Sequence, residues 1–148
     1  MQQVTKILFT RAGYEKLPGE LAKLQAYREE VLVRLQRARE QGDLSENGAY
    51  KAARFELGDT DAKIRRVQHQ IKFGVPTDAP KDGTIGVGSS VTLVKDDGSK
   101  VTYEIVGTYE ADPLKGKISL ESPMGLALKG KKSGEKFEVN GAYYKIFH

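Results

Sequence analysis

The sequence predicts an α+β protein in which an antiparallel α-helical coiled-coil hairpin precedes a small antiparallel-sheet domain. Residues 14–73 are rich in Leu, Ala, Glu, Lys, Arg and Gln, a composition that favours helix. Residues 74–83 concentrate Gly, Pro and Asp, which is typical of a linker. The residues that follow alternate β-branched or aromatic side chains with polar ones, as strands do. We therefore expect a hairpin at 1–75, a linker at 76–83 and a globular domain at 84–148.

The predicted helices each carry a seam of mostly apolar residues, spaced alternately by three and four. The seam of the first helix consists of Leu17, Leu21, Leu24, Arg28, Val31, Leu35 and Ala38, and that of the second of Tyr50, Ala53, Leu57, Thr60, Ile64, Val67 and Ile71. Read in opposite directions, the two lists pair layer by layer, from Ala38 with Tyr50 to Leu17 with Ile71. Arg28 and Thr60 then share one polar layer, which is how coiled coils fix their register. The hairpin should fold back near Leu44.

The second half of the sequence contains three clear strand patterns, at 90–94, 101–106 and 142–147. An Asp97-Gly98 pair joins the first two strands and predicts a tight hairpin. Ser122-Pro123 has the residue types of a helix N-cap and first helical residue, so a short helix should begin there.

Composition excludes several classes of function. The chain has 148 residues and no cysteine, which rules out a disulfide scaffold, cysteine-ligated zinc and a thiol nucleophile. His69 and His148 are the only histidines and have no metal-ligand spacing. No apolar run is long enough for a membrane span or a signal peptide, so we expect a cytoplasmic protein without a membrane partner.

The net charge of +4 lies entirely in the first half of the chain. Residues 1–75 hold 14 Lys+Arg against 10 Asp+Glu, residues 76–148 hold 10 against 10, and all eight arginines are in the first part. Arginine suits the recognition of phosphate, so a polyanionic partner belongs with the helical half. A solvated helix surface explains the same charge equally well.

The predicted turn of the hairpin carries two acidic residues, Asp43 and Glu46. Their spacing fits a capping box at the start of the second helix, with Gly42 in a left-handed conformation that ends the first. Alternatively, two carboxylates at the end of a hairpin form half of a Mg²⁺ site that a partner completes, because magnesium requires six oxygen ligands. A collar of basic residues surrounds this position and would hold a phosphate backbone: Arg34, Arg37, Arg39, Lys51 and Arg54.

The sequence resembles the GreA/GreB family of bacterial transcript cleavage factors, and is more similar to GreA. The resemblance rests on the run Ala38-Arg39-Glu40-Gln41-Gly42-Asp43-Leu44-Ser45-Glu46-Asn47 and on Tyr50-Lys51-Ala52-Ala53-Arg54 after it. Gly13-Tyr14-Glu15-Lys16-Leu17 resembles the start of the family's first helix, and Ile118 to Met124 resembles part of its C-terminal domain. The similarity covers almost the whole chain in order.

This resemblance implies a factor that stimulates RNA polymerase and is not itself an enzyme. The C-terminal domain would be FKBP-like, without isomerase activity, and would dock on the polymerase rim through Asp112, Ser122, Pro123 and Met124. The coiled coil would enter the secondary channel, where Asp43 and Glu46 assist a Mg²⁺ shared with the polymerase active centre. The polymerase would then cleave backtracked RNA and rescue the arrested complex. The RNA 3′ end would lie near Arg37, Arg39, Lys51 and Arg54. A monomer without a small-molecule substrate or stably bound metal is expected.

Some positions depart from the family pattern and leave alternatives open. Ala49 stands where the family commonly has an acidic residue, Pro18 should kink the first helix or delay its start, and the C-terminus is short. One alternative is therefore a factor that binds the same channel and inhibits transcription. Without the resemblance, a coiled-coil chaperone or a prolyl isomerase would be considered, although the aromatics of the second half alternate along strands and so belong to a core.

Overall fold

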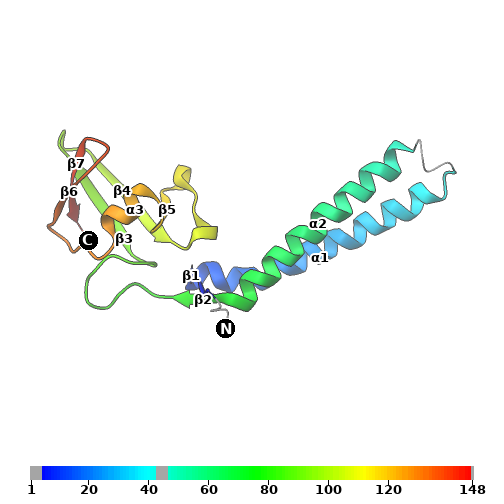
Figure 1. Ribbon diagram of the computed structural model, residues 1–148, viewed down its shortest axis with the longest axis horizontal. Helices are drawn as coiled ribbons and strands as arrows, with labels where there is room; N and C mark the ends of the chain where they lie inside the picture. Colours follow the sequence, from blue (N-terminus) through cyan, green and yellow to red (C-terminus); the bar gives the residue numbers. More distant parts are fainter. Residues whose placement is uncertain (1–4, 43–46, 148) are drawn as a thin grey trace. The chain divides into compact units, whose positions relative to one another are not determined.

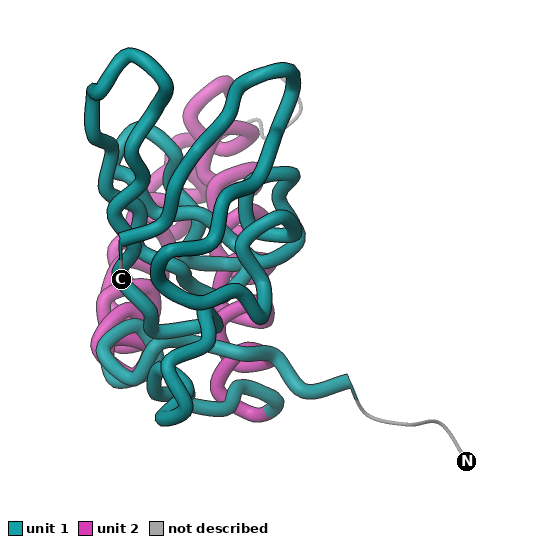
Figure 2. Tube along the Cα trace, turned by 90° about the vertical axis from the view of Figure 1, so that its left-hand side faces the viewer, with its two compact units in different colours: residues 1–15, 73–148 teal, residues 16–72 magenta. Residues whose placement is uncertain are grey.

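The computed structural model describes residues 5–42 and 47–147 of the chain. The chain divides into two compact units, of which the first combines residues 1–15 with 73–148 and the second contains residues 16–72 (Figure 2). The second unit is helical and the first contains the sheets (Figure 1). The predicted α+β class, with a helical hairpin followed by a mainly antiparallel sheet, is confirmed.

The hairpin consists of α1 (Arg11–Arg39) and α2 (Gly48–Phe73), which run antiparallel (Figure 1). Every residue of the two predicted seams is buried or half-buried, as the heptad pattern predicts. Arg28 Nε donates to Asp61 Oδ1 at 2.6 Å, one residue from the predicted partner Thr60, which is 2% exposed. Ion pairing between Arg34 and Glu56 fits the same register. The predicted polar layer is therefore present.

Helix α1 begins earlier than the proline in its first turns led us to expect. The helix starts at Arg11 and continues through Pro18 to Arg39 without interruption, so the expected delay of its start is wrong. The reason lies in Thr10, whose hydroxyl accepts a hydrogen bond from the backbone N–H of Gly13 at 3.0 Å and so acts as the N-cap. The cap stabilises the first turn of the helix, so α1 begins before Pro18 although proline lacks a backbone N–H to donate.

Two short strands flank the hairpin and pair in parallel. Strand β1 (Ile7–Thr10) immediately precedes α1, and β2 (Gly74–Thr77) immediately follows α2, with Ile7 opposite Gly74. Neither strand was predicted from the sequence. Their pairing brings the chain entering the hairpin beside the chain leaving it, and both strands belong to the sheet-containing unit.

The main sheet has five strands in the order β5-β4-β3-β7-β6. Its strands are β3 (Ser90–Lys95), β4 (Lys100–Val106), β5 (Lys117–Ser119), β6 (Lys136–Val139) and β7 (Ala142–Phe147). All neighbours are antiparallel except β4 and β5. Two 3-10 turns, η1 (Thr108–Glu110) and η2 (Pro113–Lys115), connect β4 to β5. The three predicted strands correspond to β3, β4 and β7.

The hydrophobic core lies against one face of this sheet. It contains Ile85, Val91, Leu93, Ile105, Ile118, Leu128 and Ile146. Leu128 comes from the short helix α3 (Pro123–Leu128), which begins as predicted, because the hydroxyl of Ser122 accepts a hydrogen bond from the N–H of Gly125 at 3.1 Å. Gly125 is required there, since a Cβ would lie only 1.9 Å from the carbonyl oxygen of Ser119. The opposite face is exposed over β6 and β7, whereas Val106 and Ser119, which pair across β4 and β5 on that face, are buried.

Candidate functional site: the end of the hairpin and a docking surface

Two residues, Gly42 and Asn47, determine how the helices end and begin at the turn of the hairpin. Gly42 has φ = +104°, so the predicted left-handed residue after the first helix is confirmed. Asn47 Oδ1 accepts a hydrogen bond from the N–H of Tyr50 at 3.1 Å, and Asn47 Nδ2 donates to the carbonyl of Ala38 at 2.8 Å. Asn47 therefore caps α2 and also ties its start to the last turn of α1.

The predicted metal-assisting pair, Asp43 and Glu46, lies outside the described residues. The capping box that the sequence offers for this pair lies outside the described residues as well. Within the described residues, α2 begins at Gly48 and its N-cap is Asn47, which directly precedes it.

The basic residues near this end of the hairpin differ in how they are neutralised. Arg28 and Arg34, which lie on α1 further from the turn, form ion pairs with carboxylates of α2. The predicted phosphate-binding residues are exposed and form no ion pair with another described residue: Arg37, Arg39, Lys51 and Arg54. Four unpaired basic side chains therefore lie close to the end of the hairpin, although Arg65 and Arg66, further from it on α2, also form no ion pair with a described residue.

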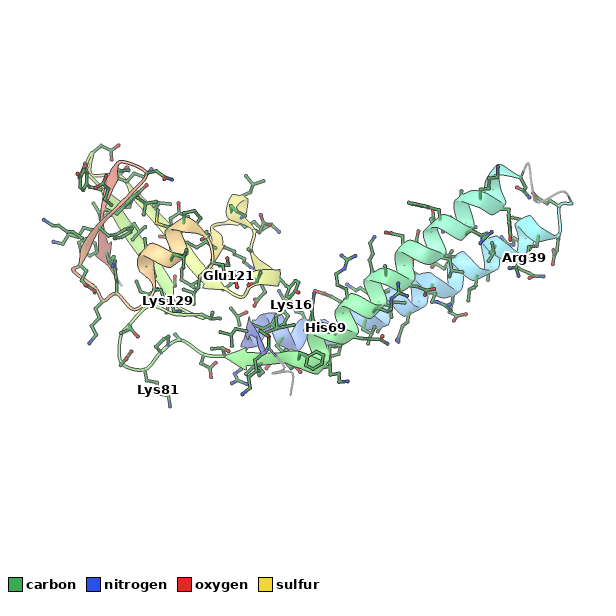
Figure 3. All side chains as sticks on the ribbon, in the orientation of Figure 1. Lys16, Arg39, His69, Lys81, Glu121 and Lys129 are labelled. Atoms are coloured by element: carbon green, nitrogen blue, oxygen red, sulfur yellow. The ribbon has the colours of Figure 1, made fainter. Side chains whose placement is uncertain are left out.

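Tyr50 brings two of these arginines together. Its ring centre lies 6.0 Å from the guanidinium carbon of Arg39 and 5.7 Å from that of Arg54, so one guanidinium comes from each helix. These distances suit cation–π contacts, which preorganise the guanidinium groups without neutralising them. Arg39 is labelled near the end of the hairpin in Figure 3. The sequence interpretation assigned Tyr50 to the seam; it is half-buried there and also positions the arginines.

Arg37 lies in a different environment from Arg39 and Arg54. It lines a hollow of about 260 Å³ together with Arg34, Gln41 and four alanines, one of which is Ala49. Ala49 is exposed and contributes only a methyl group to this hollow. Position 49 therefore adds no charge to this hollow.

One carboxylate of the hairpin, Glu56, has its pKa shifted by a paired arginine. Hydrogen bonds from Arg34, and next from the hydroxyl of Tyr27, lower the pKa of Glu56 below its ordinary value. The same contacts raise the pKa of Arg34. Glu56 therefore remains charged at neutral pH and fixes Arg34, which is consequently less available to an external phosphate than Arg39 or Arg54.

The predicted docking residues lie in the sheet-containing unit, around β5 and α3. Pro123 is exposed at the first position of α3, whereas Met124 is half-buried against the core. Ser122 uses its hydroxyl to cap α3 and to donate to the carbonyl of Ser119 at 2.7 Å. Asp112 exchanges backbone hydrogen bonds with Lys117 at 2.8 and 3.1 Å. Only Pro123 of these four is fully available to a partner.

The structure adds exposed apolar residues that sequence reasoning missed. Leu114 in η2 is completely exposed, and Leu126 of α3 is 63% exposed. A hollow of about 330 Å³ lies near Glu121, which is labelled in Figure 3, and its wall includes Leu8, Tyr109 and Leu120. The sequence does contain a signal for Leu114, because it follows Asp112 and Pro113, residue types that are typical of turns. A large apolar side chain in a turn indicates an exposed apolar residue that a partner could contact.

Within the described residues, no group of three or more His, Asp or Glu side chains forms a metal site. The helices of this part of the chain also lack the combination of length and apolarity that a bilayer crossing requires.

Comparison with known proteins covers both units. The family model described as "Transcription elongation factor, N-terminal" matches residues 7–73, and "Transcription elongation factor, GreA/GreB, C-term" matches residues 79–146. Transcription elongation factor GreA of Novosphingobium aromaticivorans is 42% identical over 94% of this chain and 89% of its own length. GreA of Maridesulfovibrio salexigens is 42% identical over 97% of this chain and 91% of its own.

A solved structure is also similar to this chain. The transcription factor Gfh1 superimposes with a TM-score of 0.50 and 26% sequence identity, covering 97% of each chain. The family models cover the hairpin and the sheet domain in the order in which this chain contains them. From these matches together, the chain belongs to the GreA/GreB family of transcription elongation factors.

Proposed function

We propose that this protein stimulates the cleavage of backtracked nascent RNA by bacterial RNA polymerase, with its hairpin inserted in the secondary channel of the enzyme. The observation that carries the proposal is the gathering of Arg39 and Arg54, one from each helix, on the ring of Tyr50 near the turn. Neither arginine forms an ion pair with a described residue, whereas Arg28 and Arg34 do. Arg65 and Arg66, further from the turn on α2, are also without an ion pair among the described residues, so it is the shared ring that sets Arg39 and Arg54 apart. Charge left unpaired in this way is available to RNA phosphates.

The dimensions of the hairpin support insertion into a channel. The 29 residues of α1 span about 43 Å at the rise of an α-helix. Seam packing and the Asn47 cap keep the two helix ends together, so the hairpin presents the acidic pair and the arginines at one end. Docking through the globular domain, at exposed Pro123 and at the exposed leucines Leu114 and Leu126, would hold the factor on the polymerase rim.

In this proposal Asp43 and Glu46 supply carboxylate oxygens to a Mg²⁺ whose other ligands come from the polymerase. Their chemistry fits, because magnesium prefers carboxylate oxygens, and two of them leave most of its six positions to other ligands. When bound, the ion would lower the pKa of an attacking water and stabilise charge on the phosphate. The residues of this chain orient that site, while Arg39 and Arg54 hold the phosphate backbone of the RNA.

The test is a cleavage assay on stalled, backtracked polymerase complexes in the presence of Mg²⁺. The parent protein should release short 3′ RNA fragments, and Asp43→Asn with Glu46→Gln should abolish the release while leaving polymerase binding intact. Glu40→Gln is the matched control, since Glu40 is an exposed acid directly after α1 and should be dispensable. A double variant that cleaves as fast as the parent protein contradicts the role assigned to the pair.

The same assay distinguishes a second candidate function, a channel-binding factor that inhibits transcription. The exposed Ala49, at a position that is commonly acidic in the family, favours this alternative. An inhibitor would slow elongation by the polymerase and release no RNA fragments. Ala49→Asp would then be the variant to examine for a gain of cleavage.

A further inference from the structure

The exposed face of the five-stranded sheet carries lysines and aromatic residues in an ordered pattern. Strand register places Lys136 opposite Lys145, Lys145 opposite Val94, and Val94 opposite Lys100. These four residues form a row across β6, β7, β3 and β4, and three of them are lysines. Adjacent strands are about 4.8 Å apart, so the row extends roughly 14 Å across the sheet.

Like charges directly opposite each other in a sheet are destabilising, and Lys136 and Lys145 form such a pair. No described carboxylate forms an ion pair with either lysine. Lys117 lies on the same face, and the acids of this face are Glu104 and Glu138. The face thus holds four lysines against two glutamates, although residues 76–148 as a whole are neutral. The arrangement therefore favours an anionic partner.

Two aromatic rings stand on this face beside the lysine row. Tyr143 is 56% exposed and Phe147 is 53% exposed, and they lie on either side of Lys145 along β7. Because they are four residues apart on one strand, their Cα atoms are separated by about 13 Å. The Nζ of Lys145 lies 5.8 Å from the ring centre of Phe147. Exposed rings next to cations are the arrangement on which unpaired bases stack.

The surface between these groups is hollowed and offers hydroxyl groups. A depression of about 420 Å³ is bordered by three lysines and one carboxylate, its lining being Val94, Lys95, Asp96, Lys136, Tyr143, Tyr144 and Lys145. The next row of the sheet runs from Phe147 to Thr92 and Thr102, whose hydroxyl oxygens are 3.1 Å apart. Hydroxyl groups both donate and accept hydrogen bonds, which suits recognition of the 2′-hydroxyl that distinguishes RNA from DNA.

We propose that this sheet face binds single-stranded RNA, with bases stacked on Tyr143 and Phe147 and phosphates along the row of Lys136, Lys145 and Lys100. The proposal concerns a surface of the globular unit and does not depend on the channel insertion of the hairpin. A duplex should bind weakly, because its bases are already stacked on one another and cannot cover the two rings.

The test is fluorescence anisotropy of a labelled oligouridine with the full chain, in a background in which Arg37, Arg39 and Arg54 of the hairpin are changed to alanine. Tyr143→Ala with Phe147→Ala should weaken binding about tenfold or more, as the loss of two stacking platforms implies. Tyr109→Ala removes an aromatic ring that is 54% exposed in the same unit and should have no effect. Lys136→Gln should reduce the salt dependence of binding by about 0.7 in the log–log slope.

A second measurement does not depend on deleting the rings. The chain has no tryptophan, so Phe147→Trp introduces a single tryptophan at the proposed platform, whose emission is followed separately from that of the tyrosines. Stacking of a base should quench its emission on addition of oligouridine, and oligodeoxyuridine of the same length should quench it less. Tyr109→Trp, at a residue that is 54% exposed in the same unit, is the control and should not respond.

Several outcomes overturn the proposal. One is an affinity for oligouridine that the ring and lysine substitutions leave unchanged, and another is equal quenching by RNA, by DNA and by a duplex. A third is unchanged RNA binding combined with weaker binding of the Tyr143 and Phe147 variants to RNA polymerase. That result would assign the sheet face to a protein contact.

Discussion

At the scale of single residues, the carboxylate of Glu110 accepts three hydrogen bonds that join the start of α1 to the loop after β4. Its Oε1 accepts hydrogen bonds from the N–H groups of Thr10 at 2.6 Å and Gly107 at 3.3 Å, and its Oε2 accepts one from the Thr10 hydroxyl at 2.5 Å. In a capping box, a glutamate three residues after the N-cap accepts a hydrogen bond from the N-cap N–H. Here that residue is Gly13, and Glu110 supplies the carboxylate from elsewhere in the chain.

We predict that Glu110→Gln destabilises the sheet-containing unit by about 1–3 kcal/mol, because the amide group offers one acceptor oxygen to three donors. The measurement is chemical denaturation followed by circular dichroism. Glu104→Gln is the control, since Glu104 is exposed on β4.

Gly13 provides an independent check of the same geometry. A Cβ at position 13 would lie 2.2 Å from Glu110 Oε2, so Gly13→Ala should be destabilising in the parent protein and much less so in a Glu110→Ala background. Costs that simply add would contradict the assignment of Glu110 as the cap.

At the scale of elements, the seam of the coiled coil is apolar except for one polar layer. Arg28 and Asp61 form an ion pair at 2.6 Å beside the buried Thr60. The contact with Asp61 raises the pKa of Arg28, so its charge is retained at every accessible pH. A polar layer of this kind fixes the register of two helices, and it does so at the expense of apolar packing.

We predict opposite effects for breaking this pair and for replacing it. Asp61→Ala alone should lower the melting temperature, because Arg28 would remain half-buried without a partner. Arg28→Met together with Asp61→Ala should restore or raise it, since the seam then becomes apolar. Thermal unfolding followed by helix ellipticity measures both variants. A double variant less stable than the single one would show that the pair contributes more than register.

The sequence revealed those features of the elements that depend on nearby residues. Heptad spacing identified the seams, and Ser122-Pro123 identified the start of α3, because both depend on residues within a turn or two. The parallel pair β1–β2 was missed because each strand is short and its partner lies 67 residues away, from Ile7 to Gly74. Glu110 was missed for the same reason, since its role in capping α1 depends on tertiary contact.

The candidate site was predictable to a similar extent. Charge counting located the arginines near the turn, but only the structure places Arg39 and Arg54 on one ring and Arg37 apart from them. The exposure of a side chain is not encoded in neighbouring residues. The sequence therefore did not identify Leu114 as exposed, and the resemblance that named Met124 did not show that this side chain is half-buried.

At the scale of the whole molecule, each unit contains a carboxylate whose pKa is lowered by an arginine. Hydrogen bonds from Arg34, and next from Tyr27, lower the pKa of Glu56 in the hairpin. In the other unit, the hydrogen bond and the charge of Arg11 lower the pKa of Asp78, at distances of 3.0 and 3.1 Å. A carboxyl group whose pKa is lower in the folded than in the unfolded chain stabilises the fold above its unfolded pKa.

We therefore predict that both units lose stability as the pH falls below about 4, the ordinary range of carboxyl pKa values, and through the lower folded values. Glu56→Gln should reduce this acid sensitivity in the hairpin, and Asp78→Asn should reduce it in the sheet-containing unit. Urea unfolding at neutral pH and at about pH 3 measures the difference. Glu138→Gln, which replaces an exposed acid without an ion pair among the described residues, should change nothing.

The parallel pairing of β1 with β2 makes the hairpin the crossover connection of a βααβ unit, and this has a consequence for folding. Parallel strands can pair only after a long segment between them has been closed, and closure of a disordered loop of that length is slow and entropically unfavourable. Antiparallel helices can form from the turn outward through contacts that are close in sequence. We therefore expect the hairpin to form before β1 and β2 pair, and to bring Ile7 and Gly74 together. On this expectation, the same two helices that would reach into a polymerase also close the loop between the two strands.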